Sequence, residues 1–159
     1  MIETIGTAVV IQRYAAPPEK VFDAFLDVEI ARRFMFATAT GEMIEAALEP
    51  AVGGEFVFVE RRPQMGDVRH VGQYLEIDRP RRLVFTFGVP QFDPRMTTVT
   101  IEIVPVAEGC RLTLTNDGVP AAHIENNREG WGLILKGLLP AYQGVHGAGW
   151  IGWKPRSSA

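Results

Sequence analysis

The sequence predicts an α+β fold in which one strand, two short helices and six antiparallel strands precede a long C-terminal helix. Three observations predict it: a helical period follows the first strand, a strand-like period begins at Gly41, and the helical period returns after Pro120. Connections between the six central strands are too short for helical crossovers, so these strands run antiparallel. The last helix is amphipathic and must bury its apolar face on the sheet.

Local patterns place each element in turn. A β-branched, mostly apolar run predicts a strand over residues 7–14, which Pro17 and Pro18 end. Short helices follow over about 18–27 and 29–35. The last helix begins after residue 120 and continues to about Tyr142. The six strands between them are bounded by Gly, Pro or Asp turn residues and are expected at 42–48, 55–61, 67–77, 83–87, 97–105 and 111–115.

Composition limits the class of protein before any motif is considered. The 159 residues are 47% apolar and 22% charged, with a net charge of −3, which suits one ordinary globular domain. No apolar run is long enough to span a membrane, and no basic cluster suits nucleic acid. The lone Cys110 permits no internal disulfide and suits a reducing compartment, so we expect a cytoplasmic protein.

The chain divides at about Tyr142 into a single domain (1–142) and a glycine-rich tail (143–159). Glycine disfavours helix in the tail, so we expect an irregular segment there. Its two tryptophans, Trp150 and Trp153, suggest docking on this chain or on a partner subunit, which leaves a homodimer as an open alternative.

No motif for covalent, metal or cofactor chemistry is found. His70, His123 and His146 lack the spacing of metal ligands, and no nucleophile elbow, P-loop or dinucleotide fingerprint occurs. The sequence therefore predicts no catalytic residue, no metal and no cofactor.

Several local sequences resemble the helix-grip (START-like, SRPBCC) superfamily, which includes birch-pollen-allergen-like domains. Within it, the likeness is greatest to the heat-shock-protein ATPase activator homologue (AHSA-type) family. The matching segments are 16–25, 52–58, 72–77, 82–87, 112–115 and 130–131. The resemblance covers about residues 7–142 and implies a curved antiparallel sheet wrapped around the long C-terminal helix, with a cavity between them.

Strand and helix periodicity then indicates which side chains face that cavity. Asn127 lies in the apolar stripe of the last helix, and Asn116 continues the inward face of its strand. Glu60 continues the face of two phenylalanines, which allows an inward carboxylate, although its place at the strand end favours a position in water. We expect the following residues to contact a ligand: Phe56, Phe58, Glu60, Tyr74, Phe87, Asn116, Asn127, Trp131 and Leu135.

Other orientations stay open at this point. If the aliphatic face of residues 67–77 points inward, which its pattern favours, then His70 and Tyr74 face solvent, unless a bulge changes the alternation. The helix glycines Gly130 and Gly137 either allow close approach of the sheet or leave space for a ligand. The arginines near turns are interpreted as solvated charges: Arg61, Arg62, Arg79, Arg81 and Arg82.

Three functions follow as expectations. The first is binding of a small hydrophobic or amphipathic molecule in the cavity. The second is a cavity-based enzyme of the cyclase, dehydratase or hydrolase type, using the polar residues Glu60, His70, Tyr74, Asn116 or Asn127. The third, co-regulation of a chaperone ATPase, is implied by the family, whose eukaryotic co-chaperones resemble this chain only in their C-terminal domain.

Overall fold

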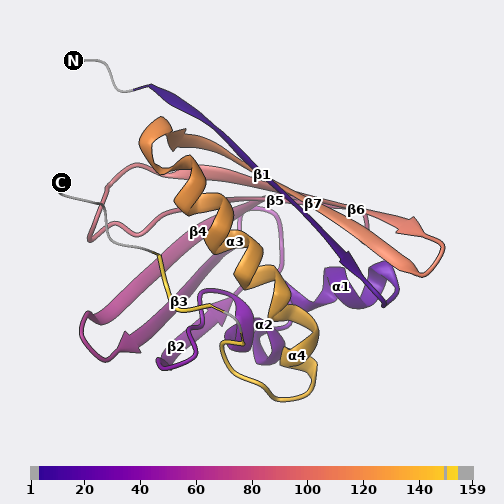
Figure 1. The fold of residues 1–159 in the computed structure, drawn as a ribbon, viewed down its shortest axis with the longest axis horizontal. Coiled ribbons are helices and arrows are strands. Elements are labelled where there is room, and N and C mark those ends of the chain that lie inside the picture. The colour runs from indigo at the N-terminus through magenta and orange to yellow at the C-terminus, as the bar shows by residue number, and fades with distance from the viewer. Residues whose placement is uncertain (1–3, 149, 154–159) are drawn as a thin grey trace.

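The computed structural model describes residues 4–148 and 150–153, and its elements follow the predicted order (Figure 1). The strands are β1 (Ile5–Tyr14), β2 (Glu42–Leu48), β3 (Glu55–Arg62), β4 (Gly66–Asp78), β5 (Arg82–Phe87), β6 (Thr97–Val106) and β7 (Gly109–Pro120). The helices are α1 (Pro18–Ala24), α2 (Val28–Phe34), a 3₁₀ turn (Ala121–His123), α3 (Ile124–Lys136) and α4 (Leu138–Tyr142). None of the helices in the described residues is long and apolar enough to cross a membrane.

One seven-stranded antiparallel sheet has the order β1-β7-β6-β5-β4-β3-β2. The first strand therefore lies beside the last one, with β1 at one edge and β2 at the other. Helix α3 packs against β1, and Figure 1 shows β2, β3 and β4 extending to the other side of the helix. This arrangement confirms the α+β class and the helix-grip architecture.

Strand β4 connects the two halves of the sheet, because its first part pairs with β3 and its last part with β5. A register shift between Tyr74 and Glu76 reverses the side to which the following residues point. Both His70, before the shift, and Ile77, after it, therefore face the core. The expectation that His70 and Tyr74 face solvent is wrong: they are 0% and 3% exposed, whereas Leu75 is 45% exposed.

The C-terminal helix is interrupted near its end. Helix α3 ends at Lys136, and Gly137 separates it from α4. Pro140 has no N–H group to donate to the Lys136 carbonyl, so a continuous helix would lose that hydrogen bond. The single helix predicted to reach Tyr142 is therefore two helices.

The described residues after α4 (143–148 and 150–153), called the C-terminal segment below, fold back beside α3 (Figure 1). The Ala39 N–H donates a 3.0 Å hydrogen bond to the Trp150 carbonyl. The Trp150 side chain is 1% exposed. This part of the tail thus packs on its own chain.

The helix glycines make room for the C-terminal segment. A Cβ atom on Gly130 would collide with the indole ring of Trp153. A Cβ atom on Gly137 would press against the Ala148 carbonyl. The chain's own C-terminal segment, rather than a strand of the sheet, therefore lies against these two glycines.

Candidate functional site

The nine residues predicted to contact a ligand all lie in the interior between the sheet and the C-terminal helix. Asn127 is half-buried. The other eight are at most 7% exposed: Phe56, Phe58, Glu60, Tyr74, Phe87, Asn116, Trp131 and Leu135. Glu60 is 0% exposed, so the alternative that placed it in water at a strand end is wrong.

Aromatic rings form the centre of this interior. We call the group Phe36, Phe56, Phe58, Phe87 and Trp131 the aromatic cluster. Phe36 lies at its middle, with its ring centroid 4.8 Å from that of Phe87 and 5.6 Å from that of Trp131. Sequence reasoning missed Phe36, because it follows α2 outside any periodic pattern and adopts a left-handed backbone conformation with φ of 62°.

His70 stacks on the aromatic cluster. Its ring is nearly parallel to that of Phe36, with 4.4 Å between centroids. Its Nδ1 atom lies 3.0 Å from the Phe58 carbonyl oxygen. Because a carbonyl only accepts, Nδ1 carries the hydrogen and Nε2 presents a lone pair. That Nε2 atom is buried and has no hydrogen-bond partner among the described residues.

Burial also fixes the charge of His70. Burial, and to a lesser extent the positive charge of Arg62, together lower the pKa of the imidazole to about 3. His70 is therefore neutral near pH 7. The interior holds an uncharged hydrogen-bond acceptor within an aromatic wall.

Glu60 is the centre of a second group, the ion-pair cluster of Glu60, Arg62, Thr38 and His146. Its Oε1 accepts hydrogen bonds from Arg62 Nε at 2.7 Å and from the Thr38 hydroxyl at 2.8 Å. Its Oε2 accepts one from the Thr38 backbone N–H at 2.7 Å and lies 3.2 Å from His146 Nε2. This buried carboxylate is thus compensated by a cation and by hydrogen-bond donors, as burial of a charge requires.

Neighbouring residues hold the ion-pair cluster in place. A Cβ atom on Gly41 would collide with the Glu60 carboxylate, so glycine leaves the space that the carboxylate occupies. Arg62 Nη2 also donates to the Phe36 carbonyl at 3.2 Å. The Arg62 guanidinium lies 5.1 Å from the ring centroid of Trp150, within cation–π distance.

The interpretation of Arg62 as a solvated charge is wrong, since its side chain is 9% exposed. A sequence signal for its position exists: Arg62 continues the alternation of Phe56, Phe58 and Glu60 along β3. No comparable signal identifies His146, which lies 86 residues from Glu60 in the chain. Its pairing with that carboxylate requires the fold.

Asn116 links the sheet to α3. Its Oδ1 accepts from Trp131 Nε1 at 3.1 Å and from Asn127 Nδ2 at 3.0 Å, and its Nδ2 donates to the Thr98 carbonyl at 3.2 Å. The side chain is fully buried and its hydrogen-bonding groups are used. Asn116 therefore positions Trp131, and with it one side of the aromatic cluster.

A separate hollow of about 750 Å³ lies where β4 passes from β3 to β5. Exposed Arg69 and Gln73 line it. Of the nine predicted residues, it touches Phe56. The hollow is thus distinct from the interior around His70.

The polar side chains of the interior are poorly suited to proton transfer. Both oxygens of Glu60 already accept hydrogen bonds, and His70 is too weak a base to take a proton near neutral pH. Among the described residues, no three His, Cys, Asp or Glu side chains lie close enough together to hold a metal ion.

The curved sheet, the C-terminal helix and the aromatic interior between them define a helix-grip domain. The chain belongs to the family described as Activator of Hsp90 ATPase homolog 1-like protein, whose model matches residues 15–142. This confirms the resemblance seen in the sequence, and the C-terminal segment lies outside the matched residues. A search of curated protein sequences gives no match to the chain.

Solved structures share the fold at low sequence identity. A protein from Chromobacterium violaceum is 26% identical, with a TM-score of 0.71 over 84% of this chain and 94% of that one. An HSP90 activator from Plasmodium falciparum is 24% identical, with a TM-score of 0.65 over 87% and 96%. An AHSA1-like protein from Aeromonas hydrophila is 18% identical, with a TM-score of 0.74 over 87% and 93%.

Proposed function

We propose that the chain binds a small hydrophobic or amphipathic molecule between the sheet and the C-terminal helix. The observation that carries this proposal is the neutral, buried His70, whose Nε2 has no partner among the described residues. Leaving a buried acceptor unpaired costs about 1–3 kcal/mol. A ligand that supplies a hydroxyl or N–H group removes this cost.

The composition of the interior supports the same class of ligand. Small-molecule sites combine mostly apolar walls with a few polar groups that orient the ligand. The aromatic cluster supplies the walls here, and His70 and half-buried Asn127 supply polar atoms; Asn127 Oδ1 is likewise buried without a partner among the described residues. We assign the nine predicted residues to this lining as part of the proposal.

The proposal is tested by a thermal-shift screen of the full chain over aromatics, fatty acids and isoprenoids. We expect at least one class to raise the melting temperature at saturation, because a ligand that binds the folded chain stabilises it. The substitution His70→Phe keeps the ring stacked on Phe36 but removes the acceptor. It should weaken binding about tenfold, the effect of one lost hydrogen bond.

Arg69→Ala is the matched control, since Arg69 lies on the same strand but lines the separate hollow beside β4. It should leave affinity unchanged. If Arg69→Ala weakens binding and His70→Phe does not, the ligand occupies the hollow and the interior site is wrong. A screen in which no compound stabilises the chain contradicts ligand binding altogether.

Family membership favours one second candidate, co-regulation of a chaperone ATPase. The Plasmodium falciparum protein of the same fold is an HSP90 activator, which gives this reading a direct assay. Adding the full chain to an Hsp90 should then increase the rate of ATP hydrolysis. An unchanged rate at saturating chain removes this candidate.

A further inference from the structure

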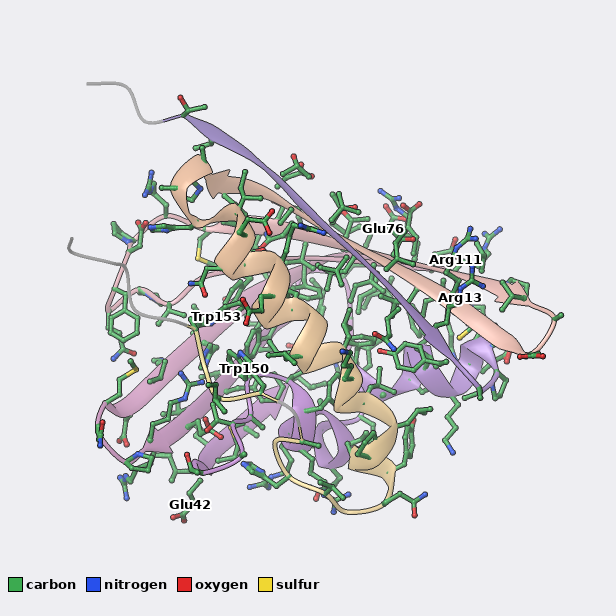
Figure 2. All side chains as sticks on the ribbon, viewed as in Figure 1. Arg13, Glu42, Glu76, Arg111, Trp150 and Trp153 are labelled. Atoms are coloured by element: carbon green, nitrogen blue, oxygen red, sulfur yellow. The ribbon has the colours of Figure 1, made fainter. Side chains whose placement is uncertain are left out.

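The C-terminal segment occupies part of the interior assigned to the ligand. Figure 2 shows Trp150 and Trp153 close together beside α3, on the side facing β3 and β4. The ring centroid of Trp153 lies 5.9 Å from that of Trp131 and 6.3 Å from that of Phe87. Both of these neighbours belong to the aromatic cluster. Trp153 therefore completes the aromatic wall that also contacts His70 through Phe87.

Helix α3 is shaped to receive this indole. Gly130 leaves the flat surface on which the Trp153 ring rests, and any larger residue at that position would displace the ring. A glycine in a helix interior costs about 0.8–1 kcal/mol relative to alanine. Trp153 is half-buried in this position.

The attachment of the segment has features of a reversible contact. The Trp150 Nε1 group is buried without a hydrogen-bond partner among the described residues, which costs free energy in the docked state. Ile151, between the two tryptophans, is 79% exposed. Gly147 and Gly152 adopt left-handed conformations, and glycine chains gain more entropy than others on release.

We propose that the C-terminal segment is an intramolecular occupant of the ligand site, in which the Trp153 indole takes the position of a planar aromatic ligand. The ligand enters when the segment is released. This inference rests on the proposed function and names both the ligand class and the regulation of the same site. The apparent affinity for the ligand then equals the affinity of the released form multiplied by the fraction of molecules whose segment is released.

The test measures binding of free indole by calorimetry to the full-length wild type, Trp153→Ala and Ile151→Ala. Trp153→Ala opens an indole-sized space beside Gly130 and should bind indole at least about tenfold more tightly than the wild type. Ile151→Ala changes an exposed residue of the same segment and should match the wild type. Circular dichroism and melting temperature establish that each variant is folded.

Hydrogen exchange of the wild type provides a second measurement that needs no variant. The Ala39 N–H is protected by the Trp150 carbonyl, so its exchange reports whether the segment is docked. Saturating indole should accelerate exchange at Ala39 while slowing it in β3 and β4.

Two results would overturn the inference. If all three chains bind indole equally and Ala39 exchange is unchanged, the segment does not compete, although ligand binding itself stands. If indole binds none of them, the position of Trp153 is not a ligand position. In that case the wider screen over fatty acids and isoprenoids decides the proposed function separately.

Discussion

At Glu60 and Arg62, opposite charges stand two residues apart on the inward face of β3 and are buried together. Burying both ions costs free energy, which their attraction and the added hydrogen bonds offset. Removing one member is therefore more harmful than the net value of the pair suggests, because the other charge is left in the interior. The adjacent Arg61 offers a direct comparison, since its side chain is 61% exposed and pairs with Asp67 in solvent.

We predict that Arg62→Met lowers the free energy of unfolding by about 3 kcal/mol, because Glu60 loses its cation in a buried site. Arg61→Met should cost less than about 1 kcal/mol, as is typical of an exposed ion pair. Urea denaturation of the two variants measures both values. Equal costs would show that the buried cluster does not depend on the charge of Arg62.

At the scale of elements, α3 contains a matched pair of glycines with different surroundings. A Cβ atom on Gly132 would make an ordinary 3.8 Å contact with Val10, whereas one on Gly130 would collide with Trp153. Both positions gain helix propensity on changing to alanine. Only the surroundings then distinguish the two substitutions.

We predict that Gly132→Ala raises the free energy of unfolding by up to about 1 kcal/mol, the helix-propensity difference. Gly130→Ala should not raise it, because the gain is offset by loss of the Trp153 contact, and tryptophan emission should shift to longer wavelength. Chemical denaturation and fluorescence spectra check both effects. Equal stabilisation by the two substitutions would mean that Trp153 does not depend on Gly130.

These elements also show what periodicity can predict and where it stops. The strand and helix order and the buried Asn116 follow from residue spacing along one element, and the same spacing allowed the inward position of Glu60 as one of two alternatives. The orientation of His70 does not, since the register shift after Tyr74 depends on how β4 pairs with β5. Alternation assumes a regular strand, and that assumption fails at a bulge.

The remaining site residues depend on contacts between distant parts of the chain. Thr38 and His146 reach Glu60 from the loop after α2 and from the C-terminal segment. Trp153 reaches Gly130 in the same way. Nothing in the local sequence around these residues marks their partners, so sequence reasoning identified Gly130 but not the indole that lies against it.

At the scale of the whole molecule, segments near both ends of the chain enclose the interior. Strand β1 pairs with β7, and the C-terminal segment covers the region between α3 and the β3–β4 half of the sheet. His70 lies in the centre of this assembly and is reached by solvent only when the assembly opens. Its protonation therefore requires that this assembly open.

We predict that the wild type loses stability as the pH falls from about 6.5, because the unfolded chain then protonates His70 and the folded chain, with a pKa of about 3, does not. Arg62 is the nearby cation that acts in the same direction. Relative to His70→Phe, the wild-type free energy of unfolding should fall by about 1.4 kcal/mol per pH unit between pH 5.5 and 4.5.

This window lies above the range of the three aspartates with lowered pKa values, Asp23, Asp67 and Asp93. Urea titrations of both chains at several pH values measure the difference, in which contributions from the other histidines cancel. Parallel curves for the two chains would mean that His70 is protonated equally in the folded and unfolded states, and the buried neutral acceptor on which the ligand proposal rests would be lost.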